Sequence, residues 1–347
     1  MSNPDAACKS YFRDSYDAFA IASDTHLKWI RTECLKDRYE VSHASKVLTP
    51  KPSGVLRPIT LLNVEYQIVY HVIVNLIADE LKKCTNQRYE KRVFAHLYAG
   101  ESSKFFNISW QRSYQKFGQR PRDFHSRGYD HIANFDLTSF YNSIDHHVLV
   151  HFQKELKIDE DTIEYLMRCL RKWTSATWDN GPVNIYHEHG TPQGPLASGM
   201  LSEAVLQHLD KAGEQGRRTI YLRYVDDIKI LAKTETDLRA KLDITSKEVG
   251  LFPQTYKINM RKVSDPEDEI KSVSRPLEPS VVPVIDQKKL TGRILELCRR
   301  GRVASSDSTR FKFLLAKVNP NHWLNARLMK VLQSHPEFAP QIAPYIS

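Results

Sequence analysis

Two adjacent carboxylates stand at residues 224–227, where the sequence is Tyr-Val-Asp-Asp. Short runs of β-branched and aromatic residues flank this tetrapeptide at 220–222 and 228–231. Such flanks predict a β-hairpin that turns at the tetrapeptide. Asp226 and Asp227 would then sit at the tip of a rigid ribbon, where their oxygens suit Mg²⁺, an ion that keeps positions open for substrate phosphates. Asp-Asp is also ordinary turn chemistry, and for the tetrapeptide alone that plainer interpretation is favoured.

A third carboxylate, Asp136, follows a predicted buried strand at residues 132–135. In a split βαβ sheet, antiparallel strands backed by helices, this strand can neighbour the hairpin around residue 224. Three carboxylates from adjacent strand ends could share two metal ions about 4 Å apart, the arrangement used for in-line phosphoryl transfer. Taken alone, Asp136 is better explained as a helix N-cap or turn residue.

Hydrophobic periodicity predicts the elements that must position these carboxylates. The expected helices lie at 5–37, 64–83 (with Asn63 as N-cap), 145–156, 159–173, 196–215 and 236–249, and a further strand lies at 256–260. A loop rich in glycine and proline at 190–196 opens the fifth of these helices. Residues 85–130 are polar, basic and aromatic without clean periodicity, and 264–287 have the composition of a linker. Basic amphipathic helices are expected at 288–318 and 321–334.

The composition is that of a folded protein with two or three lobes. The chain has 347 residues, of which 41% are apolar and 26% charged. No apolar stretch is long enough for a membrane span, and the first residues lack a signal-peptide core, so we expect a cytoplasmic protein without membrane contact. Its five scattered cysteines disfavour a zinc site or a disulfide framework.

The net charge is +9, and basic residues crowd two segments of the chain. One set comprises Lys82, Lys83, Arg88, Lys91, Arg92, Arg112, Lys116, Arg120, Arg122 and Arg127, and the other comprises Lys288, Lys289, Arg293, Arg299, Arg300, Arg302, Arg310, Lys312 and Lys317. Nucleic-acid backbones are the natural partner of such stripes, because neutralising phosphates releases counterions. A solvated basic surface is the alternative.

Five blocks then occur in an order that resembles a known family. They are Lys51 with Arg57-Pro58, Phe135-Asp136-Leu137 with Phe140-Tyr141, Thr191-Pro192-Gln193-Gly194, Arg223-Tyr224-Val225-Asp226-Asp227, and Gly250-Leu251 with Lys257. Together they are far more specific than Asp-Asp alone. Over residues 45–262 the chain resembles a prokaryotic reverse transcriptase, of the group that includes group II intron, retron and abortive-infection or defence-associated enzymes.

The resemblance implies an α+β fold, a right-hand polymerase with fingers, a split βαβ palm and a helical thumb. The N-terminal helices and fingers would occupy 1–130, with a basic and aromatic insert at about 85–130. The palm would span 131–263, interleaved with the fingers. A linker at 264–287 would lead to a basic helical thumb at 288–347.

The resemblance also implies roles for individual residues. Asp136, Asp226 and Asp227, with the backbone carbonyl of Leu137, would hold two Mg²⁺ ions, Mn²⁺ being the alternative. The residues that would contact the nucleotide are Lys51, Arg57, Tyr141, Gln193, Gly194 and Lys257. Tyr141 falls where the family has an aromatic gate against the ribose 2′-hydroxyl, with Phe140 as the candidate if the register is off by one. In the thumb, Arg293, Arg299, Arg300 and Arg302 would bind nucleic acid.

The implied function is RNA-directed DNA synthesis, adding dNTPs to a 3′-hydroxyl. The expected partners are an RNA template or non-coding RNA, the DNA product and dNTPs, with a second copy or an operon-encoded protein as further candidates. Antiphage defence is expected because intron-mobility motifs are missing from the sequence. Two alternatives stay open: untemplated or protein-primed DNA synthesis, and a catalytically silent RNA-binding scaffold. The three aspartates argue against the scaffold.

Overall fold

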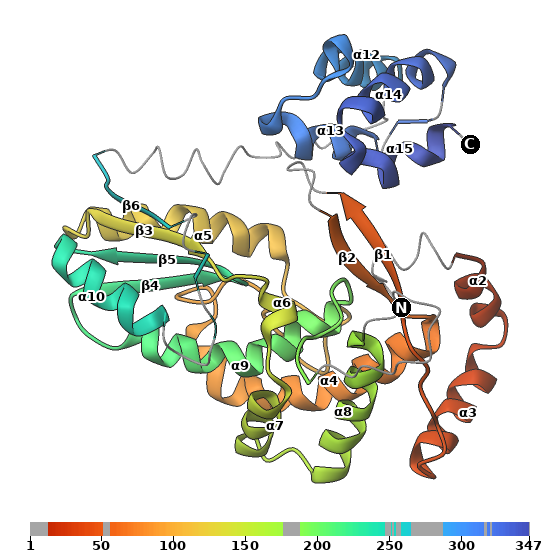
Figure 1. Ribbon diagram of the computed structural model, residues 1–347, viewed down its shortest axis with the longest axis horizontal. Helices are drawn as coiled ribbons and strands as arrows, with labels where there is room; N and C mark the ends of the chain where they lie inside the picture. The colour runs from red at the N-terminus through yellow and green to blue at the C-terminus, as the bar shows by residue number, and fades with distance from the viewer. Residues whose placement is uncertain are drawn as a thin grey trace. The chain divides into compact units, whose positions relative to one another are not determined.

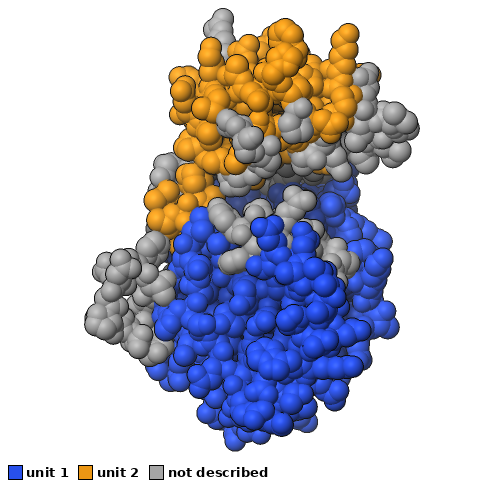
Figure 2. All heavy atoms as spheres, turned by 90° about the vertical axis from the view of Figure 1, so that its right-hand side faces the viewer, with its two compact units in different colours: residues 1–47, 59–274 blue, residues 48–58, 275–347 orange. Residues whose placement is uncertain are grey.

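The computed structural model (Figure 1) describes residues 13–50, 56–175, 188–246, 251, 253–254, 258–264, 287–315, 318–319 and 321–346. The chain forms two compact units, coloured in Figure 2: residues 1–47 with 59–274, and residues 48–58 with 275–347. None of the described helices is both long and apolar enough to cross a membrane.

An antiparallel sheet of four strands forms the framework of the first unit, in the order β4-β5-β3-β6 (Figure 1). The strands are β3 (His131–Asp136), β4 (Thr219–Tyr224), β5 (Asp227–Ala232) and β6 (Asn259–Lys262). β3 pairs with β5 from His131 opposite Ala232 to Asp136 opposite Asp227. The prediction that the strand ending at Asp136 neighbours the hairpin is therefore confirmed. β6 begins later than the predicted strand at 256–260, whose first two residues lie outside the described chain.

Helices cover both faces of this sheet. The side chains of successive strand residues point to opposite faces. On one face lies α5 (Trp110–His125), whose apolar side chains pack with every second strand residue: Phe117 and Phe124 share a cluster with Ile132, Ile220, Leu222 and Leu231. On the other face lie α9 (Leu196–Glu214) and α10 (Glu235–Ser246), which share the main core with Ala133, Phe135, Tyr221 and Ile230 (Figure 1).

Helix α5 is the element that periodicity did not predict. Few of its residues are apolar, and most of the others are polar or charged. Pro121 lies inside it, a residue that normally marks a helix end. The apolar face of α5 is therefore narrow, and the sequence does not show that a sheet is available to cover it.

The helices around the sheet confirm most of the predicted segments. They are α4 (Val64–Thr85), η1 (Asn86–Arg88), α6 (Phe140–Ser143), α7 (His146–Glu155) and α8 (Glu160–Thr174). Side-chain caps fix three starting points: Asn63 accepts from the amide of Tyr66, Asp145 from those of His147 and Val148, and Asp159 from that of Thr162.

The N-terminal segment differs from the predicted single helix at 5–37. It contains α2 (Arg13–Ile21) and α3 (Ser23–Leu35), with Ala22 between them outside helical geometry (φ −128°, ψ 35°). Ser23 and Asp24 follow the break, and such residues favour a helix start over a helix interior. A two-stranded sheet of β1 (Ser45–Pro50) and β2 (Leu56–Leu61) comes next.

The second unit contains a helical bundle with its own apolar core. Its elements are α12 (Gln287–Leu297), η4 (Arg299–Gly301), η5 (Ser305–Asp307), α13 (Ser308–Leu315), α14 (His322–Ser334), η6 (Pro336–Phe338) and α15 (Ala339–Ile346). The prediction for 321–334 is confirmed, whereas 288–318 is not one helix. Helix α12 ends at Leu297, and Gly301, the last residue of η4, takes a left-handed conformation (φ +77°) in which a helix does not continue. The predicted linker lies almost wholly outside the described residues.

Candidate active site

The three predicted aspartates come together at one end of the sheet. Asp136 and Asp227 are direct partners across the β3–β5 pair, so their side chains share a face with Cβ atoms about 4.5–5.5 Å apart. The amide of Leu137 donates to the carbonyl of Asp226 over 3.1 Å, which ties the end of β3 to the turn. All three aspartates are partly exposed. The site therefore joins two strand ends that lie ninety residues apart in sequence.

The turn that carries Asp226 is strained. Tyr224 and Asp227 are the last pair of β4 and β5, which leaves Val225 and Asp226 as a loop of two residues. Val225 has φ +55°, in the left-handed region. Glycine usually occupies such a position in a tight hairpin, and a β-branched residue there is an outlier that costs on the order of 1–3 kcal/mol. The turn therefore needs support from its surroundings.

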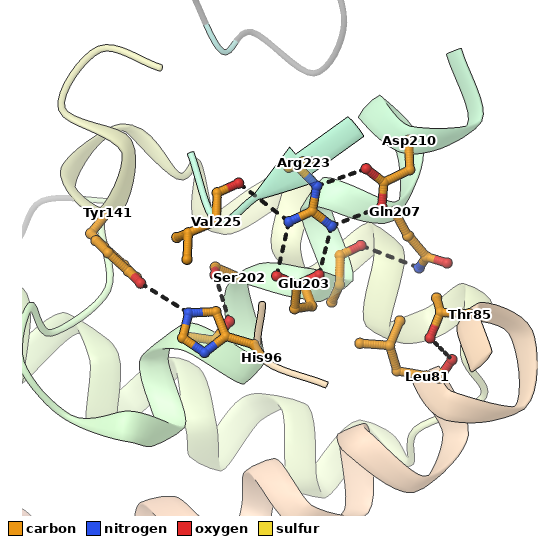
Figure 3. A network of polar contacts seen from close by, with 12 residues as sticks. Leu81, Thr85, His96, Tyr141, Ser202, Glu203, Gln207, Asp210, Arg223 and Val225 are labelled. Carbon is orange, nitrogen blue, oxygen red and sulfur yellow. Dashed lines mark hydrogen bonds and ion pairs between the residues drawn. The ribbon is translucent and has the colours of Figure 1, made fainter. Parts of the chain in front are cut away.

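Arg223 supplies that support from inside the protein (Figure 3). Its side chain is fully buried, and its guanidinium bonds two carboxylates of α9: Asp210 through Nε at 2.7 Å and Nη2 at 2.8 Å, and Glu203 through Nη1 at 3.0 Å and Nη2 at 2.7 Å. Nη1 also donates to the carbonyl oxygen of Val225 over 3.3 Å. Helix α9 thus fixes the arginine, and the arginine holds the strained residue beside Asp226.

This triad is an unusual charge arrangement, with two buried carboxylates and one buried guanidinium. Burial raises the pKa of Glu203, and the charge of Arg223 opposes that rise. In the sequence, Arg223 stands out only as the residue before the tetrapeptide, and Glu203 and Asp210 do not stand out as site residues. Their spacing was the available signal, because acidic residues seven apart lie on one face of a helix.

Tyr141 follows the end of β3 closely in sequence, and its ring is partly exposed. After β3, Ser139 (φ +46°) starts the short helix α6, in which Phe140 is buried and Tyr141 partly exposed. The hydroxyl of Tyr141 lies 3.4 Å from Nε2 of His96. The backbone carbonyl of Tyr141 accepts a hydrogen bond from the amide of Thr191 over 2.7 Å. Of the two candidate gate residues, Tyr141 has the better placement.

His96 is a site neighbour that sequence reasoning missed. Its backbone is left-handed (φ +48°), and its ring packs against Gly199 of α9 so closely that a Cβ there would lie 2.1 Å from a ring carbon. Burial, together with the nearby charge of Arg223, lowers the pKa of His96 to about 4. The ring is therefore neutral at pH 7. A glycine in the middle of a predicted helix was the only hint of this close contact.

The depressed pKa of His96 predicts a pH-dependent stability. Between pH 6.5 and about 4 the unfolded chain binds a proton at this residue that the folded chain does not, so the free energy of unfolding falls as the pH falls. We expect His96→Asn to remove about 1–3 kcal/mol of this loss, since asparagine tolerates left-handed backbone and does not titrate. Urea unfolding of both proteins from pH 7 to 4 measures the difference. Parallel pH profiles would contradict the prediction.

The loop of Gln193 and Gly194 is tied to β2. The carbonyl of Gln193 accepts from the amide of Thr60 over 2.8 Å. Gly194 has φ +129°, and a Cβ there would lie 3.1 Å from Cγ2 of Ile59, so both conformation and space favour glycine. Arg57 is exposed on β2. Lys51 and Lys257, the other predicted triphosphate contacts, lie outside the described residues.

The predicted nucleic-acid contacts of the second unit lie close together in its first elements. Arg293 on α12, Arg299 in η4 and Arg302 after it are all exposed, and Arg299 is 3.6 Å from Glu296. The backbone of Arg300 belongs to η4, but its side chain lies outside the description. The role of these residues stays a prediction.

The aspartates fit a metal ion that is bound together with substrate. Among the described residues, no three Asp, Glu, His or Cys side chains converge into a ready-made metal site. Mg²⁺ does not require one, because it is usually held by one or two carboxylates together with substrate phosphates and water. The opposed pair Asp136 and Asp227, with Asp226 beside them, offers hard oxygen ligands at a partly exposed sheet end.

The match to a known family covers the aspartates and the residues described around them, but not the predicted nucleic-acid contacts at residues 293–302. Residues 49–273, more than half of the chain, match the family described as reverse transcriptase (RNA-dependent DNA polymerase). The chain belongs to the reverse transcriptase family. This membership places it among the nucleotidyltransferases and confirms the predicted α+β polymerase fold. All three aspartates of this reverse transcriptase lie within the matched range.

Solved structures with a similar fold share little sequence with this reverse transcriptase. They include telomerase from Candida albicans in complex with a TWJ fragment of telomeric RNA (TM-score 0.48, 13% identity, 89% of this chain and 60% of that one). For apo telomerase from Candida tropicalis truncated from the C-terminal domain, the TM-score is 0.45 and the identity 12%, over 65% of this chain and 51% of that one. For the RNA-dependent RNA polymerase of a human picobirnavirus, the TM-score is 0.40 and the identity 13%, over 87% of this chain and 59% of that one. The matched chains are longer, and this one covers between half and three fifths of them. No curated protein matches the chain.

Proposed function

We propose that this protein is an RNA-directed DNA polymerase that adds dNTPs to a 3′-hydroxyl. The observation that carries the proposal is the register of β3 and β5, which sets Asp136 opposite Asp227 and beside Asp226 in a chain of the reverse transcriptase family. In the reaction, the 3′-oxygen forms a bond to the α-phosphorus of the dNTP. The bond from that phosphorus to the bridging oxygen breaks, and pyrophosphate leaves.

The chain's own residues would bind and orient the reactants. Asp136, Asp226 and Asp227, with the carbonyl of Leu137, would hold two Mg²⁺ ions. When bound, these ions would favour ionisation of the attacking hydroxyl and stabilise the charge on the departing pyrophosphate. The exposed guanidinium of Arg57 suits bidentate contact with triphosphate oxygens, and Lys51 and Lys257 would add positive charge. Arg223 would fix the orientation of Asp226 by holding the carbonyl of Val225.

Incorporation of labelled dNTPs tests this function. Purified protein is given a primer annealed to RNA, all four dNTPs and either Mg²⁺ or Mn²⁺, with and without a chelator. We expect metal-dependent extension of the primer that stops when the metal is removed. Failure to incorporate label with either metal on RNA, on DNA and without template would contradict the proposal and favour the RNA-binding scaffold.

Tyr141 is expected to select the sugar of the incoming nucleotide. Its partly exposed ring, whose hydroxyl contacts His96, would crowd a ribose 2′-hydroxyl. We expect Tyr141→Ala to lower the ratio of kcat/KM for dATP over ATP by about 10- to 100-fold, and Tyr141→Phe, which keeps the ring, to preserve most of it. Steady-state kinetics with both nucleotides measures the ratio. An unchanged ratio in Tyr141→Ala would contradict the role of Tyr141 in excluding the ribose 2′-hydroxyl.

We further propose that the enzyme belongs to the prokaryotic, defence-associated group and works in the cytoplasm. The order and spacing of its five sequence blocks support the prokaryotic group, and the lack of intron-mobility motifs in these residues supports the defence setting. Expression in a bacterial host challenged with a panel of phages tests the setting, with Asp226→Asn as the matched control. Protection that requires Asp226 would support a defence role. Equal plaque counts for both proteins on every phage would contradict it.

A further inference from the structure

Five basic side chains and one acidic side chain surround a cavity of about 520 Å³ in the first unit. They are Arg88, Lys91, Arg92, Arg120, Arg127 and Glu214. The volume lies within the range of ligand-binding pockets. The cavity lies where the ends of η1, α5 and α9 meet the segment that borders β4. That segment bonds to the edge strand: Arg223 donates its amide to the carbonyl of Arg92 over 2.8 Å, and Phe94 donates to the carbonyl of Arg223 over 3.0 Å.

Three of the guanidinium groups surround a single aromatic ring. Those of Arg92, Arg120 and Arg127 lie 5.3, 5.5 and 5.7 Å from the ring centroid of Phe124, which is itself buried. Like charges gathered so closely repel one another. The effect is visible at Arg92, where burial lowers the pKa and the charge of Arg120 lowers it further, against the opposing charge of Glu214.

The described residues neutralise only part of this cluster. Nη1 of Arg120 pairs with Asp123 at 2.9 Å. Glu214, the acidic residue of the lining, is already engaged by Nε of Arg88 at 2.8 Å. Nη1 of Arg92 and Nε of Arg120 are buried without a hydrogen-bond partner among the described residues. Lys91 and Arg127 are exposed, and neither forms an ion pair with any other residue that the structure describes. Because buried donors are normally satisfied, the cluster has the chemistry of a site that awaits an anion.

We propose that this cavity binds backbone phosphates of an RNA strand, at a site separate from the aspartates. Phosphate oxygens match guanidinium donors in geometry and charge. The ring of Phe124 is buried and flanked by arginines, so no free aromatic face is available to stack a base. The site therefore suits the phosphate backbone better than a free nucleoside. The choice of RNA rests on the proposed function.

The salt dependence of RNA binding tests the proposal. The double variant Lys91→Gln/Arg127→Gln removes two exposed charges from the lining. We expect roughly tenfold weaker RNA binding near physiological salt, and a log K against log salt slope shallower by about 1.4–1.8. Arg168→Gln/Arg239→Gln removes two exposed charges from α8 and α10 instead, and should change neither. If both double variants give the same slope and affinity as the unmodified protein, the proposal is wrong.

Cys84 reports on the cavity directly, because this exposed thiol lines it. We expect RNA to slow alkylation of Cys84, with Cys84→Ser identifying the labelled site, and Lys91→Gln/Arg127→Gln to lose that protection. Protection by inorganic tripolyphosphate but not by RNA would overturn the RNA assignment in favour of a small polyphosphate. Both binding measurements omit dNTPs, so they are independent of polymerase activity. A protein that binds RNA here but incorporates no nucleotide contradicts only the proposed function.

Discussion

Replacing Arg223 with methionine is expected to lower the free energy of unfolding by about 3–5 kcal/mol and to abolish polymerase activity. The change leaves Glu203 and Asp210 buried without their counter-charge, which is the costly way to break a buried ion pair. It also removes the donor to the carbonyl of Val225, so the strained turn beside Asp226 loses its internal support. Urea denaturation and primer extension measure the two effects.

Two controls separate charge from position. Arg239→Met removes a guanidinium from an exposed pair with Glu235 and should cost less than about 1 kcal/mol. The triple variant Arg223→Met/Glu203→Met/Asp210→Leu removes all three charges, so it should recover much of the stability but not the activity. A stability loss below about 1 kcal/mol in Arg223→Met, or full activity in the triple variant, would contradict the role given to this triad.

Substituting aspartates of the candidate site is the second large effect. We expect Asp136→Asn and Asp226→Asn each to lower the extension rate by about 10³-fold or more, because a bound ion supplies several kcal/mol of transition-state stabilisation. The matched control is Asp145→Asn, which caps α7 and should keep its activity because asparagine caps helices equally well. Circular dichroism checks that each variant folds. If the extension rate of Asp136→Asn stays within tenfold of that of the unmodified protein, Asp136 does not have the proposed metal-binding role.

The site's core was predictable because its signals are local. Two short apolar runs around an acidic turn predict a hairpin, and a buried run ending at Asp136 predicts a third strand. Few sheet arrangements place the hairpin beside this third strand. The observed β3–β5 register, from His131 to Asp136, belongs to one of those arrangements. The capped helices were predictable for the same reason, since Asn63, Asp145 and Asp159 lie beside the amides that they bind.

The missed features all depend on contacts between distant segments. Arg223 meets Glu203 and Asp210 only after β4 packs on α9, and His96 reaches Tyr141 only through the space left by Gly199. The basic residues between 82 and 127 were visible as a stripe. Their convergence on Phe124 required the unpredicted helix α5, so the cavity could not be inferred from charge alone.

The most direct test of RNA-directed DNA synthesis is the sequence of the product made on a defined template. A heteropolymeric RNA with an annealed DNA primer is incubated with the protein, Mg²⁺ and four dNTPs, beside Asp226→Asn, and the extended strands are sequenced. The structure predicts DNA complementary to the RNA from the unmodified protein and none from Asp226→Asn. Product unrelated to the template, or equal product from both proteins, would contradict it.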